Sequence, residues 1–147
     1  MKRWESIDYY FIFKIRYGVH LINSYDIERC ILEMNKLENI IDNTFTLFPL
    51  VDEFSNLCNE IKSDVKGKVL GNRLQARTNL IKSDISQYKL AITDSNNAIK
   101  EFFRVSDLKR QYQYRSRIEY ESNNYNQALK WLTSSLALGN EDNFEVN

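Results

Sequence analysis

Tyr88-Lys89-Leu90-Ala91-Ile92 and, 37 residues later, Tyr125-Asn126-Gln127-Ala128-Leu129 open two stretches of the chain that share one pattern. In both, a second small residue follows seven positions after the alanine, with a branched aliphatic residue beside it: Ala98-Ile99 and Ser135-Leu136. Small side chains on successive turns let two antiparallel helices approach closely, and the neighbouring aliphatic side chains fill the contact. The two stretches therefore predict helix hairpins.

The pattern resembles a known helical repeat. Residues 124–138 are similar to the second helix of a tetratricopeptide repeat, and residues 88–99 are similar to a more divergent copy, with residues 72–84 and 107–121 as the preceding first helices. The resemblance covers residues 72–140 and implies stacked antiparallel hairpins. Its period of 37 residues exceeds the usual period of roughly 34. Because small residues at this spacing occur in any antiparallel helix hairpin, hairpins without a repeat array stay an alternative.

The composition agrees with an all-α fold. The 147 residues include four glycines and one proline, too few for the many tight turns of a sheet protein, while 43% hydrophobic residues can form a core. We predict one helical domain over residues 1–140 with six or seven helices. Residues 1–66 would cap the array, residues 72–140 would form two tetratricopeptide-like hairpins, and residues 141–147 would be a frayed acidic tail.

The N-terminal half is harder to assign. Residues 4–22 alternate like a half-buried strand, but Ile7, Phe11, Ile15 and Val19 also recur at helical spacing, and we predict a helix because the chain offers no partner strand. A second helix follows from Ser24 to about Ile41, and another begins after Pro49. Gly67 and Gly71 are expected to break or loosen that helix before residue 72.

Charge and cysteine content exclude several classes of function. Twenty basic and twenty acidic residues cancel, so the whole molecule is not drawn to nucleic acid or to an anionic membrane. Cys30 and Cys58, with one histidine in the chain, do not supply a closed zinc site, and no cofactor motif occurs. We expect free thiols in a reducing compartment, no membrane span and a cytoplasmic location.

Two chemical alternatives remain. Arg16-Tyr17-Gly18-Val19-His20 resembles the Arg-x-x-x-x-His motif of the all-α HEPN ribonucleases, one residue short, which implies that Arg16 and His20 act on an RNA phosphate. Residues 109–117 interleave basic and aromatic residues, as a binder of single-stranded nucleic acid does, although a charged exposed helix face explains them more simply. We predict no enzyme and no nucleic-acid partner.

The tetratricopeptide resemblance implies a binding surface on the first helices of the repeats. It makes the chain a protein-interaction module, an adaptor, a regulator or a small chaperone, that binds a peptide or a partner helix. A homo-oligomer stays open. The candidate partner-binding residues are Asn72, Gln75, Asn79, Lys82, Lys109, Tyr112, Gln113, Ser116 and Tyr120.

Overall fold

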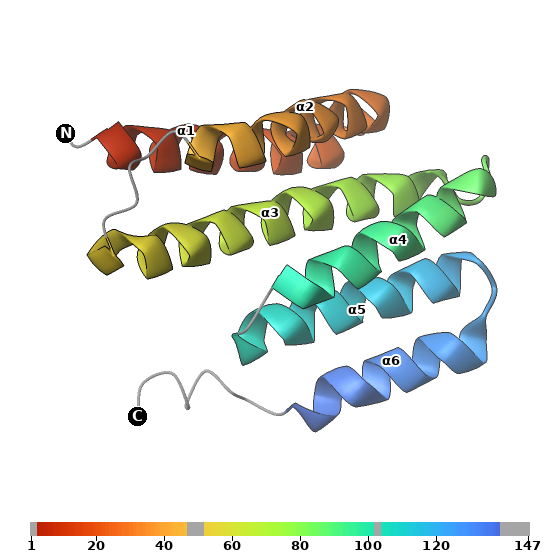
Figure 1. Cartoon of the computed structure of the whole chain (residues 1–147). Coiled ribbons are helices and arrows are strands. Elements are labelled where there is room, and N and C mark those ends of the chain that lie inside the picture. Colours follow the sequence, from red (N-terminus) through yellow and green to blue (C-terminus); the bar gives the residue numbers. More distant parts are fainter. Residues whose placement is uncertain (1–2, 47–51, 102–103, 139–147) are drawn as a thin grey trace.

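The computed structural model describes residues 3–46, 52–101 and 104–138, and these contain six α-helices and no strand (Figure 1). The helices are α1 (Arg3–Asn23), α2 (Ile27–Thr46), α3 (Asp52–Leu80), α4 (Ser86–Glu101), α5 (Val105–Glu121) and α6 (Tyr125–Ala137). The predicted all-α fold is confirmed, including the choice of helix over strand for residues 4–22. The predicted tail at residues 141–147 lies outside the described residues.

Helices that follow one another in the chain pack as hairpins, α1 with α2, α3 with α4 and α5 with α6 (Figure 1). The first helices also contact each other in order, since α3 packs against both α1 and α5. Each hairpin joins the next through its second helix, because α2 packs on α3 and α4 packs on α5. The chain is therefore an array of helical hairpins in which α1, α3 and α5 form a row.

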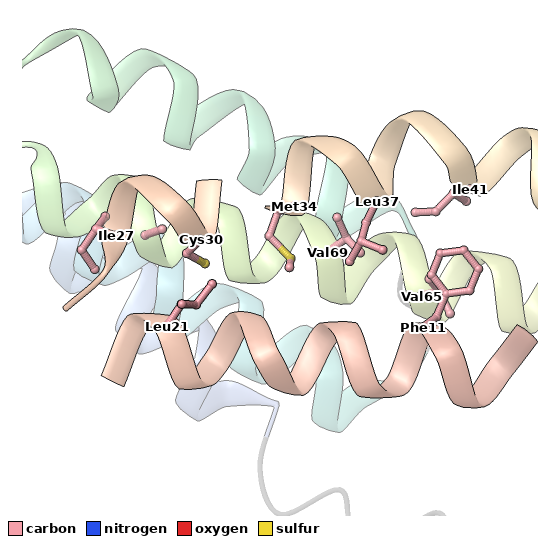
Figure 2. Packing of buried hydrophobic residues seen from close by; sticks show 10 residues of the cluster. Phe11, Leu21, Ile27, Cys30, Met34, Leu37, Ile41, Val65 and Val69 are labelled. Carbon is pink, nitrogen blue, oxygen red and sulfur yellow. The ribbon is translucent and has the colours of Figure 1, made fainter. Parts of the chain in front are cut away.

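Two hydrophobic clusters hold this array together, one on each side of α3. The first lies between α1, α2 and α3, and α2 contributes a buried stripe at spacings of three and four residues: Ile27, Cys30, Met34, Leu37 and Ile41 (Figure 2). The second lies between α3, α4 and α5 and contains Leu70, Leu74, Ile81, Ala91, Ala98 and Ile118. Because α3 contributes to both clusters, it is the central helix of the fold.

The small residues of the sequence pattern lie at the predicted helix contacts. Ala91, Ala98 and Ser135 are fully buried and Ala128 nearly so, and the Ser135 hydroxyl donates a hydrogen bond to the Lys109 carbonyl of α5 (3.0 Å). Tyr88 at the start of the first stretch packs against the second cluster, and its hydroxyl donates a hydrogen bond to the buried Glu119 carboxylate (3.1 Å). Tyr125, at the matching position of the second stretch, is exposed instead.

The break expected at Gly67 and Gly71 is also wrong, because α3 runs without interruption through both. A Cβ atom added at Gly71 would lie 3.2 Å from Nε2 of Gln111 on α5. Gly71 therefore permits a close approach of α5 to α3 rather than ending a helix. The predicted cap of residues 1–66 and the first predicted hairpin consequently share one continuous helix.

A buried polar network joins α2, α3 and α4. The Arg73 guanidinium donates two hydrogen bonds to the Asp94 carboxylate (2.9 and 2.7 Å) and one each to Asn35 (2.9 Å) and Glu38 (2.8 Å). Nε of Arg77 lies 3.1 Å from Oδ2 of Asp94 as an ion pair without hydrogen-bond alignment. Burial lowers the pKa of Arg73, but Asp94 and Glu38 together raise it further than burial lowers it. The network thus fixes α3 against the second helices of two hairpins.

Candidate partner-binding groove

A groove of about 660 Å³ lies along the row of first helices. Helix α1 lines it with Ile12, Ile15, Arg16 and Val19, α3 with residues from Glu60 to Gln75, and α5 with Asp107, Arg110, Gln111 and Tyr114, while Glu101 and Arg104 border it between α4 and α5. The three hairpins therefore each contribute their first helix to one concave site.

The α1 wall is mainly apolar and the α3 and α5 walls carry charge. Asp64 and Lys68 on α3 form an ion pair (2.8 Å), and Asp107 stands near them on α5. Burial and the nearby Asp64 carboxylate raise the pKa of Asp107, against the opposing charges of Lys68, Arg104 and Arg110. Both signs of charge are thus available to a bound segment.

Gln111 is the unusual residue of the groove. Its side chain is 3% exposed, and its carbonyl oxygen Oε1 has no hydrogen-bond partner among the described residues. At the 37-residue offset of the sequence pattern it corresponds to Leu74, which is buried in the second cluster. A buried acceptor without a partner costs about 1–3 kcal/mol. The sequence therefore keeps an unpaired amide oxygen where the preceding hairpin has an apolar core residue.

Tyr114 lies one turn further along the α5 wall. It packs against the second cluster and lines the groove with its half-buried ring. Burial raises the pKa of its hydroxyl, although the Arg110 charge and the Gln75 amide act in the opposite direction. The protonated Tyr114 hydroxyl and the Gln111 carbonyl thus give the α5 wall a donor and an acceptor.

Of the four predicted binding residues on α3 and in the turn after it, two line the groove and two lie beyond it. Asn72 does not present a free side chain to a partner, contrary to the expectation. Its side chain is buried and donates a hydrogen bond to the Ile15 carbonyl of α1 (3.0 Å). Gln75 lines the groove and donates to the Gly71 carbonyl (3.2 Å). Asn79 accepts a hydrogen bond from Arg117 (3.3 Å). The predicted α3 surface is therefore mostly engaged within the chain.

Lys82, the fourth of these predicted residues, lies in the turn after α3. It is exposed and forms an ion pair with Glu121 of α5 (3.3 Å). Its ammonium group is therefore already matched by a carboxylate of its own chain, at an exposed position where such pairs contribute little.

The predicted residues on α5 do not face the groove. Ser116 donates to the Ala128 carbonyl of α6 (2.7 Å), the Tyr112 ring lies 5.4 Å from the Trp131 ring of α6, and the Lys109 carbonyl accepts from Ser135. Gln113 and Tyr120 are exposed but are absent from the groove lining. None of the five residues therefore lines the groove, and Lys109, Tyr112 and Ser116 lie against α6 within the last hairpin.

Sequence reasoning missed the α1 wall and the α5 wall of the groove. A signal for the second was present, since Asp107, Gln111, Tyr114 and Ile118 recur at spacings of four, three and four. That spacing marks one face of a helix, and Ile118 at its end is buried against α3 and α4. This stripe was hard to recognise in the sequence because its first two residues, Asp107 and Gln111, are polar.

Arg16 and His20 lie four residues apart on α1, and residues 109–117 lie on α5. Arg16 lines the groove, whereas His20 is exposed near the end of α1 and contacts the Ser24 hydroxyl at 3.5 Å. In residues 109–117, Tyr112 and Tyr114 are engaged in packing, and the Arg115 guanidinium lies 5.0 Å above the Trp131 ring. These aromatic rings are therefore not free to stack on bases.

Cys30 has the character of a core residue. It is buried, and burial together with the Asp26 charge raises the pKa of its thiol to about 11. The thiol is thus protonated at neutral pH, when it is neither a nucleophile nor a metal ligand. The side chain of Cys58 lies outside the described residues.

Neither a metal cluster nor a membrane helix occurs in the ranges that the structure describes. No group of three or more His, Cys, Asp or Glu side chains there is placed to hold a metal ion. None of the helices in those ranges is long and apolar enough to cross a bilayer.

Comparisons of the chain with protein-family models, with curated proteins and with solved structures found no match. The most specific features of the groove are the row of three first helices and the unpaired amide oxygen of Gln111 on its α5 wall.

Proposed function

We propose that this chain is a protein-interaction module that binds a short segment of another protein in the groove between α1, α3 and α5. The observation that carries the proposal is the buried Gln111 carbonyl, an acceptor without a partner on the groove wall. Once the Gln111 amide turns toward the groove, a bound donor would satisfy this oxygen and recover the cost of leaving it unpaired. Adaptor, regulator and small chaperone are the roles that fit such a module, and the cytoplasmic location remains a prediction.

An extended segment fits this acceptor better than a partner helix does. The backbone N–H groups of a helix are used in its own hydrogen bonds, whereas an extended peptide presents N–H groups that need acceptors. Ile12, Ile15 and Val19 on the opposite wall offer contacts for apolar side chains of the same segment. The proposed ligand is therefore an extended peptide with apolar residues beside a free backbone donor.

The two chemical alternatives, a ribonuclease and a binder of single-stranded nucleic acid, have less support in the structure. A ribonuclease would need Arg16 and His20 to act together, and single-stranded nucleic acid would need the aromatic rings of residues 109–117, which are engaged in packing. No contact among the described residues favours either. RNA cleavage that His20→Ala abolishes would restore the first alternative.

The substitution Gln111→Leu should weaken peptide binding without lowering the stability of the fold. Selection from a random-peptide display library against the full chain should yield peptide ligands, and the substitution should weaken their binding about 5- to 10-fold because one hydrogen-bond acceptor is lost. Thermal or denaturant unfolding should show no loss of stability, because leucine at this buried position removes an unpaired polar group. Fluorescence anisotropy with a labelled peptide measures the affinity.

Gln113→Leu is the matched control, since Gln113 is an exposed glutamine of the same helix outside the groove. Peptide affinity should be unchanged in this variant. Failure to enrich any peptide, or loss of binding in Gln113→Leu with full binding in Gln111→Leu, would contradict the proposal.

A further inference from the structure

Helix α6 exposes an apolar stripe that no described part of the chain covers. Tyr125, Leu129, Leu132 and Leu136 follow each other at spacings of four, three and four, and Leu129 and Leu136 are 63% and 66% exposed. The ring of Tyr120 on α5 meets the Tyr125 ring edge-on at 5.5 Å and extends the patch. Contiguous exposed apolar side chains of this kind mark an interaction surface.

This stripe is distinct from the face that α6 uses in its own hairpin. Ala128, Trp131 and Ser135 contact α5, and they lie about 100° around the helix from the leucines. Spacings of four and three are those of the seam between two helices wound around each other. The exposed stripe therefore has the pattern of a second helix contact that is not made within the described chain.

We propose that two copies of this chain pair through their α6 helices, antiparallel about a two-fold axis. In that arrangement Leu129 of one copy meets Leu132 of the other, and Tyr125 meets Leu136. Such a contact is self-complementary, as an interface related by a two-fold axis must be.

The charges on α6 favour a second copy over a membrane surface as the occupant. Lys130 is the one charged residue among the 13 of the helix, and at about 100° per residue it points away from the stripe. Asn126 and Thr133 flank the seam instead, so two copies meet without repulsion between like charges. A membrane surface would call for several basic residues beside the apolar stripe, and α6 provides one.

One helix pair forms a small interface, so the pairing should be reversible and should depend on concentration. Helix α6 contributes no residue to the groove between α1, α3 and α5. The pairing and the proposed peptide binding are therefore independent, and either can fail without the other.

Sedimentation equilibrium of the full chain tests the pairing. Between about 1 µM and 1 mM, the mean mass should rise from one chain towards two. Leu129→Glu should weaken the association at least about 10-fold, because it places a carboxylate on the seam, and should leave the circular dichroism spectrum unchanged since the position is exposed. Leu132→Glu should behave in the same way.

Phe13→Glu is the control, because Phe13 is a comparably exposed apolar residue at a distance from α6, on α1. It should associate as the unchanged chain does. A chain that stays monomeric throughout the range would overturn the proposal, and so would association that Phe13→Glu abolishes and Leu129→Glu does not. Binding to vesicles of anionic lipid by a monomeric chain, lost in Leu129→Glu, would assign the stripe to a membrane surface and overturn it as well.

Discussion

Asp94→Ala should lower the free energy of unfolding by about 3–5 kcal/mol, because it leaves buried guanidinium charge without its carboxylate. Asp94 is 3% exposed and receives both hydrogen bonds of the Arg73 pair, with Arg77 as a second cation. Glu38 alone would remain as a counter-charge for Arg73. Denaturant unfolding followed by circular dichroism measures the change.

Glu60→Ala is the control for the loss of stability in Asp94→Ala, since Glu60 is an exposed carboxylate on the central helix α3. Its removal should change the free energy of unfolding by no more than about 0.5 kcal/mol. Equal effects of the two substitutions would mean that the Asp94 network does not hold α4 against α3.

Ile118→Ala should cost about 2–5 kcal/mol of unfolding free energy, because it opens a cavity where α3, α4 and α5 meet. Ile118 is fully buried. The loss would weaken the attachment of the last hairpin to the rest of the array, so a broader unfolding transition should accompany the lower midpoint. Chemical denaturation with a tyrosine or tryptophan fluorescence probe reports it.

Ile85→Ala removes the same atoms from a 74% exposed side chain in the turn before α4. Its effect should stay within about 0.5 kcal/mol. If the two isoleucines cost the same when truncated, the second hydrophobic cluster would not be the core that joins the hairpins.

Much of the fold could be predicted from the sequence because the local signals agree with the packing. The small residues at positions 91, 98, 128 and 135 all lie in helix contacts, and α5 and α6 closely match the predicted helices 107–121 and 124–138. The break in α3 was predicted wrongly for a physical reason. Glycine weakens a helix and also permits close approach, and at Gly71 the contact with α5 decides which effect prevails.

The candidate site could be predicted only in part. The expectation that first helices provide a binding surface led to Gln75, which lines the groove, but the register of α5 could not be fixed from its polar residues alone. Gln111 and Asp107 look like solvent-facing residues in the sequence. The burial of Gln111 depends on α3, where Gly71 approaches it, and such a long-range contact leaves no local signal in the sequence.

The central claim is that a peptide occupies the groove between α1, α3 and α5. Chemical-shift mapping of the isotope-labelled chain, titrated with a peptide from the display selection, tests it most directly. We predict shifts concentrated at Val19, Gln75, Gln111 and Tyr114, with Leu32 on α2 and Leu90 on α4 unaffected. Shifts confined to α2, α4 or α6, with the groove residues unmoved, would contradict the account.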